Sequence, residues 1–472
     1  MESFDAIVVG GGAAGCVLAA RLSEDAGRTV CLIEAGPDYG PRSAGRWPRE
    51  LLDPSAIPES HDWYDEDGSL PWARVVGGCS AHNACAVTQG AASEYDAWGP
   101  GWSWATLAPC LARARDALGA RARAGPDVGT WHAAVLEAAV EAGLPRLPSL
   151  DAERAGVGVA ATNVVDGARH NAAFAYLDPA RARSNLTVLG DTLVDRVAFG
   201  RGGRATGVVL RDRTVHGGCV VLAAGAYGSP AVLLRSGVGP GGEQHALPGV
   251  GAGLADHCRA GVGFSLRDEA AAALRAEHGE RAIMAQCIAK WASSRAAGGE
   301  WDVHLLAIVP PDRSTGRITA GLVAPRSRGR VGLRSRDPAA LPRVEPGFLS
   351  DDDGHDLAAL AEAIDFARGL AATRALGAVA TGAIEPGPEI AATAHARATV
   401  ASYYHPTGTC RLGPATDRLA VVDADAAVHG LENVYVGDAS IIPEPVRAGT
   451  HLTALAVAER VAELLRTGAG AP

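Results

Sequence analysis

The sequence predicts an α/β fold, and three features at the start of the chain carry this prediction. Residues 4–9 are an apolar run that is typical of a buried strand. The turn 10–15, GGGAAG, follows at once and matches the pattern G-x-G-x-x-G. A helical stretch at 16–23 leads to a second apolar run at 29–33, which ends in Glu34. Strand, glycine turn, helix, strand and acid in this order predict a Rossmann-type unit that binds a dinucleotide.

Each part of this unit has a physical task in holding a dinucleotide. Gly10 allows the tight turn, Gly12 lets backbone N–H groups approach a pyrophosphate, and Gly15 lets the helix pack close to the strand. The N-terminus of the helix offers unpaired N–H groups and a partial positive charge to the phosphates. Glu34 follows the second strand, where a carboxylate can bind ribose hydroxyls.

The elements after Glu34 extend the pattern toward the middle of the chain. Residues 37–73 are rich in Pro, Gly and acids and predict a long irregular excursion of the kind that carries function or covers a site. Residues 104–143 have helical spacing. Strand-like segments fill 186–210, with a turn at 200–203 that predicts a hairpin, and 218–225 is another buried strand that ends in glycine.

The last third of the chain returns to the same kind of pattern. Residues 259–345 mix short strand candidates, such as 303–309 and 330–334, with turns, and 355–376 is predicted to be helical. A strand at 434–438 ends in Asp438, and a helix is predicted at about 452–465. Nucleotide-binding elements therefore lie at both ends of the chain, which predicts a discontinuous domain with a second domain inserted.

Composition and charge narrow the class of protein. The 472 residues are 47% hydrophobic and 20% charged, which suits a folded protein of two domains. The net charge is −10 and no basic stripe is present, so we expect no nucleic-acid partner and no binding to an anionic membrane. The sequence has no apolar run of about 18 residues, so we expect no membrane-spanning helix.

The cysteines and the N-terminus indicate the compartment. Nine cysteines are scattered without a C-x-x-C pair, which argues against a zinc cluster or a disulfide framework, and we expect no metal site. The N-terminal residues lack the basic region of a secretory signal and include Glu2 and Asp5. We expect a cytoplasmic protein, and the sequence leaves its oligomeric state open.

Five separate segments, in conserved order and spacing, resemble the glucose–methanol–choline (GMC) oxidoreductases. Segment 225–239 resembles the second signature of that family and 74–83, RVVGGCSAHN, resembles the first. The other three are 247–257, which runs from PGVG to Asp256 and His257, the active-site stretch 405–413, HPTGTCRLG, and the C-terminal flavin contact 436–440, VGDAS. Together they span nearly the whole chain.

This resemblance implies a fold, a cofactor and a reaction. The family fold is a Rossmann-type FAD domain plus a substrate domain with an antiparallel sheet and flanking helices, so FAD is expected rather than a nicotinamide nucleotide. The expected reaction oxidises a small alcohol to an aldehyde or ketone by hydride transfer to flavin N5, with dioxygen or another electron acceptor as oxidant. We assign residues 1–150, 168–257 and 408–472 to the FAD-binding domain, and residues 151–167 and 258–407 to the substrate-binding domain.

Two histidines are the predicted catalytic pair. Alcohol oxidation requires a group that takes the hydroxyl proton, and histidine suits this because its ordinary pKa lies near neutrality. His405 matches the catalytic histidine of the family, and His451 matches the second position, where many members carry Asn. The resemblance therefore implies two groups that polarise or deprotonate one substrate hydroxyl.

His82 predicts how the cofactor is attached. The segment GGCSAHN is similar to the choline oxidase segment whose histidine carries a covalent 8α-linked flavin, so a covalent bond between His82 and FAD is expected. Asn83 is expected near the flavin C4 carbonyl and N5, and Asp438 resembles the acid that contacts the ribityl chain. The full set of expected cofactor contacts is Gly10, Gly12, Ala13, Ala14, Gly15, Glu34, Ala35, Gly77, Gly78, Ser80, His82, Asn83, Ala84, Val194, Ala224, Gly225, Asp438, Ala439, His451, Leu452 and Thr453.

The substrate is less well defined by the sequence. His304 lies in a strand that faces the substrate cavity in relatives, whereas Cys79, Cys85 and Cys410 are expected to be small packing residues. Quaternary ammonium recognition uses an aromatic cage, and residues 259–330 show no obvious aromatic cluster, so choline is not implied. The chain is also shorter than most family members, which suggests a more open pocket for a bulky or carrier-linked substrate.

Two other classes of function fit the same sequence. Some proteins of this fold are lyases, and one branch is a fatty-acid photodecarboxylase; the histidine pair is compatible with such chemistry. A flavoprotein without catalytic activity is the third hypothesis, and the presence of both histidines disfavours it.

Overall fold

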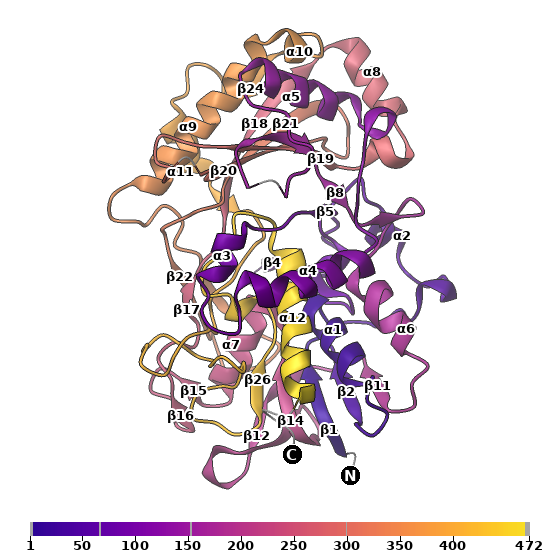
Figure 1. Cartoon of the computed structure of the whole chain (residues 1–472), viewed down its shortest axis with the longest axis vertical. Helices are drawn as coiled ribbons and strands as arrows, with labels where there is room; N and C mark the ends of the chain where they lie inside the picture. Colours follow the sequence, from indigo (N-terminus) through magenta and orange to yellow (C-terminus); the bar gives the residue numbers. More distant parts are fainter. Residues whose placement is uncertain (1–2, 66–67, 152, 299, 468–472) are drawn as a thin grey trace.

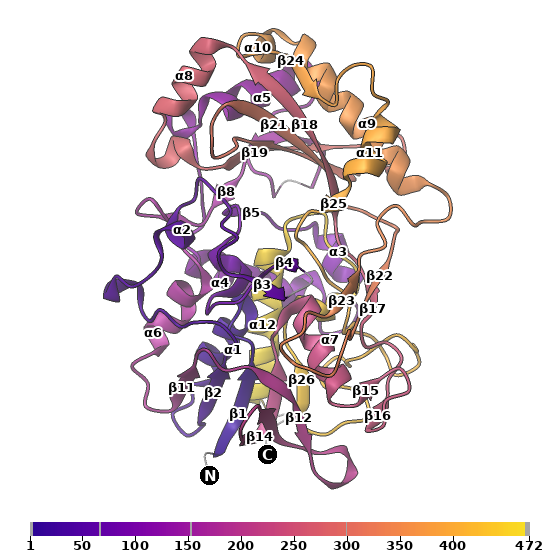
Figure 2. The ribbon, with the colours of Figure 1, turned by 180° about the vertical axis from the view of Figure 1, so that it is seen from behind.

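The computed structural model describes residues 3–65, 68–151, 153–298 and 300–467. Two lobes lie one above the other along the longest axis, each built around a seven-stranded sheet, and both chain ends lie at the far end of the lower lobe (Figure 1). The view from behind shows the sheet of the upper lobe, with its helices gathered on the outer side (Figure 2). The α/β fold class is confirmed.

The lower sheet contains the predicted βαβ unit. Its strand order is β11-β2-β1-β14-β13-β12, and β26 pairs with β14. The strands β11, β2, β1, β14 and β26 run parallel, whereas β12 and β13 form the predicted antiparallel hairpin. Their bounds are β1 (Ser3–Val9), β2 (Val30–Ile33), β11 (Leu186–Leu189), β12 (Val194–Phe199), β13 (Ala205–Leu210), β14 (Thr214–Leu222) and β26 (Val434–Val436).

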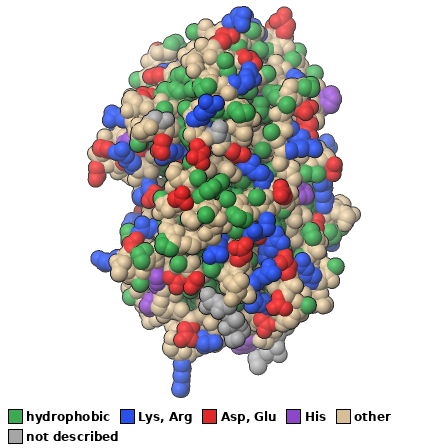
Figure 3. Space-filling model, viewed as in Figure 1, with side chains coloured by type: hydrophobic (Ala, Val, Ile, Leu, Met, Phe, Trp, Pro, Cys, Tyr) green, Lys and Arg blue, Asp and Glu red, His purple; other side chains and the backbone are tan. Residues whose placement is uncertain are grey.

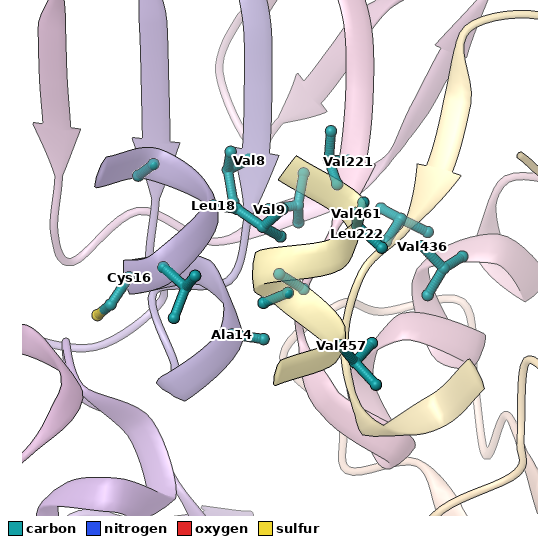
Figure 4. Close-up of a cluster of buried hydrophobic side chains, with 14 of the residues drawn as sticks. Val8, Val9, Ala14, Cys16, Leu18, Val221, Leu222, Val436, Val457 and Val461 are labelled. Atoms are coloured by element: carbon teal, nitrogen blue, oxygen red, sulfur yellow. The ribbon is translucent and has the colours of Figure 1, made fainter. Parts of the chain in front are cut away.

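The core of the lower lobe joins the two ends of the chain. The first helix and the last pack side by side on the sheet, where apolar side chains from β1, β14 and β26 meet them (Figure 4). Leu18 of the first helix and Val457 and Val461 of the last are fully buried in this cluster. The discontinuous arrangement is thus stabilised by burial of apolar surface. The helices of this lobe are α1 (Ala13–Leu22), α4 (Trp104–Ala117), α6 (Asp178–Ala180), α7 (Gly225–Arg235) and α12 (Thr450–Thr467).

The upper sheet is antiparallel, as the family resemblance implies. Its order is β24-β18-β21-β20-β19-β7, and β25 pairs with β18. The bounds are β7 (Gly156–Val159), β18 (Cys258–Leu266), β19 (Ala285–Trp291), β20 (Val303–Ile308), β21 (Thr315–Leu322), β24 (Ala380–Glu385) and β25 (Ala401–Ser402). The helices of this lobe are α5 (Thr130–Glu141), α8 (Asp268–Ala276), α9 (His355–Gly369), α10 (Arg374–Gly377) and α11 (Ala392–Thr399).

One helix belongs to a different lobe from the one we assigned. We placed residues 1–150 in the nucleotide-binding domain, but α5 contributes Trp131, Val135 and Ala138 to the core of the upper lobe. The reason is that the buried face of α5 packs on β19 and β20. The other boundaries of the division remain a prediction.

The excursion at 37–73 is more regular than the sequence indicated. It contains the helix α2 (Arg49–Leu52) and an antiparallel hairpin of β3 (Asp62–Asp65) and β4 (Gly68–Ala73). Trp63 and Trp72 stack across this hairpin with ring centroids 4.7 Å apart, and the edge of Trp72 meets Tyr227. Packing of these aromatic rings therefore orders a segment whose Pro- and Gly-rich composition predicts irregular structure.

Short elements connect the two lobes and line the edges of the lower one. The helix α3 (Ala92–Asp96) precedes α4, and the remaining strands pair in four small sheets. These strands are β5 (Ala86–Val87), β6 (Arg121–Ala122), β8 (Ala161–Thr162), β9 (Val164–Val165), β10 (Ala168–Arg169), β15 (Val238–Gly239), β16 (His245–Ala246), β17 (Ala252–Leu254), β22 (Gly329–Gly332) and β23 (Arg343–Glu345).

Surface charge, cysteines and helix hydropathy complete the description. Basic and acidic side chains are interspersed on the face that Figure 3 shows. Cys85 and Cys410 are buried, as expected for packing residues, whereas Cys79 is exposed. In the described ranges, no helix is long and apolar enough to cross a membrane, and no cluster of three His, Cys, Asp or Glu could hold a metal ion.

Candidate active site

The glycine turn between β1 and α1 is so tight that two of its positions exclude any side chain. Gly10 has a φ of 100°, and a Cβ on it would lie 2.7 Å from the carbonyl oxygen of Ala223. A Cβ on Gly15 would lie 1.8 Å from the carbonyl oxygen of Gly10. Gly12 caps α1 without a side chain, so the first N–H groups of the helix, which begin at Ala13 and Ala14, are open to an anion.

A second glycine pair packs against this turn. Gly77 donates its N–H to the carbonyl oxygen of Gly11 at 2.7 Å. Gly78 has a φ of 52°, and a Cβ on it would lie 2.5 Å from the Cα of Gly12. Ser80 donates to the Gly77 carbonyl oxygen at 2.5 Å and accepts from Ala172, so its hydroxyl holds the segment together. Two backbone strips without side chains therefore meet where a pyrophosphate would be approached.

Glu34 ends β2 beside the turn, as predicted. Its carboxylate accepts N–H groups from Gly11 at 2.7 Å and Gly36 at 2.9 Å, and burial raises its pKa to about 7. A carboxylate has about four lone-pair sites, so two backbone donors leave capacity for ribose hydroxyls. Ala35 follows and uses its carbonyl oxygen to accept from Arg74. Val194 begins β12, close after Thr192, whose N–H bonds the Glu34 carbonyl oxygen.

Asp438 accepts more hydrogen bonds from the protein itself than the sequence indicated. It follows β26, is 2% exposed, and accepts from the N–H of Gly225 at 2.8 Å, the hydroxyl of Ser229 and the N–H of Ser440. Ala224 precedes α7, and its N–H donates to Ser229. Burial raises the pKa of the Asp438 carboxyl. Asp438 thus joins the start of α7 to the segment that begins with Ala439, and a contact with a ribityl chain remains a prediction.

His82 and Asn83 follow the second glycine pair and face different neighbours. His82 is 7% exposed; its Nδ1 lies 3.9 Å from Asp62 Oδ1, and its buried Nε2 has no hydrogen-bond partner in the described part of the chain. Asn83 accepts from the Cys85 N–H at 3.0 Å through Oδ1 and contacts His451 Nδ1 at 3.2 Å through Nδ2. Ala84 packs at the edge of an apolar cluster that includes Tyr403.

His405 is held by a carboxylate and a second imidazole. The backbone N–H of His405 donates to Asp256 Oδ1 at 2.9 Å, and its ring Nδ1 lies 2.9 Å from the Nδ1 of His257. The ring of Tyr403 packs on it edge-on, with centroids 4.9 Å apart. A Cβ on Gly449 would lie 3.6 Å from His405 Nε2. The free edge of His405 therefore faces the segment that leads into α12.

His451 lies in the first turn of α12, two residues after Gly449. Its Nε2 is buried and has no partner within the described ranges, whereas Nδ1 contacts the Asn83 amide. Leu452 and Thr453 are buried behind it, and the Thr453 hydroxyl bonds the Tyr95 hydroxyl at 3.0 Å. The structure thus places His451 against Asn83, and it places Gly449, two residues before His451, beside His405 Nε2.

Burial keeps the imidazoles of this region neutral at pH 7. It lowers the pKa of His405 and of His451 to about 4, and that of His82 to about 4 with a further contribution from the charge of Arg169. The pKa of His257 lies well below its ordinary value for the same reason. Neutral imidazole has one nitrogen that donates and one that accepts, so each ring can take part in directed proton transfer.

His257 and Asp256 are functional residues whose roles the sequence did not reveal. They were part of a matched segment, but that match gave neither of them a task. Here Asp256 fixes the backbone of His405 and His257 fixes its ring. His304, which we predicted to contact substrate, is 3% exposed, and its Nε2 has no hydrogen-bond partner in the described structure. Sequence offered no signal for the pairing of two histidines so distant along the chain.

The site combines a cradle for a dinucleotide with neutral histidines beside it, which defines a dinucleotide-dependent redox enzyme. The uncapped start of α1, the glycine strips and the unpartnered Nε2 atoms of His82 and His451 all fit a flavin dinucleotide. Sequence profiles of the GMC oxidoreductases match residues 4–259 and 325–458. The chain therefore belongs to the GMC oxidoreductase family, uses FAD and is a flavin-dependent alcohol oxidoreductase.

Individual relatives align over almost the whole chain. Choline oxidase from Arthrobacter globiformis is 31% identical over 99% of this chain and 95% of its own length. Mitochondrial choline dehydrogenase from Mus musculus is 29% identical over 98% and 90%, respectively. The crystal structure of pyridoxine 4-oxidase from Mesorbium loti has a TM-score of 0.86 and 28% identity, covering 98% of this chain and 99% of that one. The alignment with choline oxidase runs over 534 positions, more than the 472 residues of this chain.

Proposed function

We propose that the protein oxidises an alcohol to an aldehyde or ketone, with His405 as the proton acceptor and His451 as the hydrogen-bond donor to the substrate oxygen. FAD, when bound, supplies the acceptor for the hydride that leaves the alcohol carbon. The observation that carries this assignment is the pair of contacts made by the two rings, His405 Nδ1 with His257 Nδ1 and His451 Nδ1 with the Asn83 amide. Each contact leaves Nε2 as the atom available to a substrate.

The Asn83 contact sets the tautomer of His451. The amide Nδ2 of Asn83 can only donate, so Nδ1 of His451 must accept. A neutral His451 then carries its hydrogen on Nε2, the buried atom that has no partner in the described structure. An N–H in that position can donate to the substrate oxygen and stabilise the negative charge that develops as its proton leaves.

The His257 contact sets the role of His405. One of the two Nδ1 atoms must carry the hydrogen that joins them. When His405 donates, its Nε2 presents a lone pair toward Gly449 and can take the hydroxyl proton, while His257 accepts from the imidazolium that results. Asp256 holds the His405 backbone, so the ring stays in place during the transfer.

We propose a neutral or anionic alcohol as substrate rather than a quaternary ammonium compound. Trp301 lies at the edge of the upper sheet, next to His304, and already has two cations near its ring. Lys290 Nζ is 3.8 Å from the ring centroid and Arg447 Cζ is 5.9 Å from it. Lys290, whose ammonium also donates to the Leu150 carbonyl oxygen, already takes the position over the ring that a substrate cation would need. Arg447, by contrast, is paired with Glu94 and Glu300. Two relatives are nevertheless named for choline. An opening that admits a bulky substrate remains part of the proposal, since the relatives carry insertions that this chain lacks.

We also propose that FAD is bound covalently through His82 and that the protein works in the cytoplasm. The buried, unpartnered Nε2 of His82 supports the link, because a bond to carbon would satisfy that atom. The scattered cysteines, without a C-x-x-C pair, support a reducing compartment. Release of FAD from wild-type protein in acid would contradict the covalent bond.

The direct test is anaerobic bleaching of the visible flavin band of the purified protein. The panel contains choline, pyridoxine and simple primary, secondary, aromatic and carboxylate-bearing alcohols. We expect bleaching by neutral or anionic alcohols and little by choline. If no alcohol of the panel bleaches protein that contains flavin, alcohol oxidation is rejected and the lyase or decarboxylase alternative is favoured. Reoxidation in air against reoxidation by a quinone then identifies the electron acceptor.

A further inference from the structure

One ring nitrogen of His82 lies beside a carboxylate, and the other has no hydrogen-bond partner in the described part of the chain. Asp62, on β3 of the hairpin, lies 3.9 Å from Nδ1, and the side chains of both residues are about nine-tenths buried, with 9% of His82 and 11% of Asp62 exposed. Nε2 is buried and has no hydrogen-bond partner among the described residues. Asp62 therefore favours the tautomer of His82 that carries its hydrogen on Nδ1, because that hydrogen is attracted to the carboxylate. The lone pair of this tautomer lies on Nε2.

A single buried arginine links the backbone around His82 to the segment that precedes the hairpin. Arg169 is fully buried, and its guanidinium donates to the carbonyl oxygens of Ala81 at 3.1 Å and Asn83 at 2.9 Å, the residues on either side of His82. It also donates to Leu51 at 2.7 Å and Ala56 at 2.6 Å, in the excursion that carries Asp62. Charge-assisted bonds of this kind are stronger than neutral ones, so the His82 segment is held firmly against residues 51–56, which lead into the hairpin.

We propose that Asp62 is a positioning residue that holds the Nδ1–H tautomer of His82 and directs Nε2 at the 8α carbon of FAD, so that the covalent bond forms there. This inference rests on the covalent attachment proposed above. It assigns a task to the hairpin that the family motif at 74–83 does not contain.

The step balances in atoms and electrons. Nε2 of His82 would form a bond to the 8α carbon, whose C–H bond would release one proton, while Nδ1 would pass its proton to Asp62. The two electrons of that C–H bond would remain on the flavin ring system. Dioxygen would then take up these two electrons together with the two released protons, including the one on Asp62, to give hydrogen peroxide and leave oxidised, linked FAD.

The protonation states of the two groups suit this transfer. Burial and the charge of Arg169 lower the pKa of His82 to about 4, so the ring is neutral and nucleophilic at pH 7. Burial raises the pKa of Asp62 to about 6, so the carboxylate can take up a proton near neutrality. Asp62 acts through His82 and touches no substrate in this scheme.

The test measures the fraction of FAD that stays with the polypeptide after denaturation, as the fluorescence of the protein band in a denaturing gel. Purified holoproteins are compared for wild type, Asp62→Asn, Asp62→Ala and the control Glu243→Gln, which removes a carboxylate whose side chain is 83% exposed. We expect the rate of linkage in air to fall roughly 10²-fold in Asp62→Ala, less in Asp62→Asn, whose amide oxygen still accepts from Nδ1, and not at all in Glu243→Gln.

The outcomes separate the possible failures. Equal linked fractions in wild type and Asp62→Ala would overturn the role of Asp62. A loss of total flavin with an unchanged linked fraction would show a structural role only and would also overturn it; Asp62→Asn gives this reading if Asp62→Ala does not fold. Wild-type protein without linked FAD would refute both the attachment and this inference, whereas alcohol bleaching would still test the proposed oxidation independently.

Discussion

The glycine cradle and the histidine site lie in one protein but are built on opposite principles. The cradle consists of backbone from 10–15 and 77–78, where space is so short that a Cβ on Gly15 would lie 1.8 Å from a carbonyl oxygen. The histidine site consists of side chains from 82–83, 256–257, 405 and 449–451, joined by hydrogen bonds of about the ordinary length. The cradle requires positions without side chains. The histidine site requires that particular ring nitrogens carry the hydrogen.

The difference predicts how each region responds to change. A substitution in the cradle should act through steric overlap and prevent cofactor binding, because backbone atoms cannot move aside cheaply. A substitution in the histidine site should leave the cofactor bound and remove a proton-transfer partner. Folding with flavin and turnover are therefore separable measurements for the two regions.

The largest effect is expected from Gly15→Ala. Its Cβ would overlap the Gly10 carbonyl, so α1 must shift from β1, and overpacking of this kind costs roughly 3 kcal/mol. We expect little protein that retains FAD, measured as the flavin-to-protein ratio and the melting temperature. Gly369→Ala, at the end of α9 with open space around its Cβ, is the matched control and should be neutral or slightly stabilising. A Gly15→Ala protein with full flavin content would contradict the steric account.

His405→Gln should be the next largest. Loss of the proton acceptor is expected to lower kcat by roughly 10²- to 10⁴-fold, with flavin content unchanged. Stopped-flow flavin reduction with the best alcohol of the panel measures the effect. His278→Gln, an exposed histidine on the upper lobe, serves as control. Reduction at the wild-type rate would discard the assignment of His405.

The two regions should also respond to pH with opposite signs. The folded-state pKa of His451 is lowered to about 4, so its contribution to stability is present above 6.5 and is lost as the pH falls. The folded-state pKa of Glu34 is raised to about 7, so its contribution is present below 4.5 and is lost as the pH rises. Between pH 5 and pH 7 each change amounts to about 2 kcal/mol.

Urea unfolding of the holoproteins at these two pH values tests the signs. His451→Gln should reduce the gain in unfolding free energy from pH 5 to pH 7, and Glu34→Gln should increase it. The same direction of change in both variants would contradict the difference between the two regions. Bound ribose that donates to Glu34 would stabilise its charged form, so the effect of Glu34→Gln should be larger in protein that lacks FAD.

The smallest effect is expected from Thr88→Val, which preserves shape and removes one hydroxyl. The Thr88 hydroxyl oxygen accepts the Gly449 N–H at 3.0 Å and so fixes the backbone beside His405 Nε2. An unpaired N–H there should cost about 1 kcal/mol in unfolding free energy and lower kcat by several-fold. Thr399→Val, on an exposed part of α11, should change neither quantity. An unaltered rate in Thr88→Val would show that the position of Gly449 does not matter.

Much of the fold was readable from the sequence because its signals are local. The β1–α1–β2 unit, the hairpin of β12 and β13, and the last helix follow from apolar periodicity and turn residues that lie next to one another in the chain. Gly10 and Gly15 belong to this group, since the need for glycine arises within one turn. The order in the excursion around Trp63 and Trp72 was missed, because those rings meet only when the hairpin forms.

The sequence by itself determined which residue types are present for a dinucleotide cradle and a histidine pair. Only the tertiary structure decided the partners: His257 for His405, Asn83 for His451, Asp62 for His82, and three backbone and hydroxyl donors for Asp438. The physical reason is that glycine sterics and apolar periodicity act between near neighbours in the chain. The tautomer and charge of a buried side chain are instead set by whatever the folded chain places within a few ångströms of it.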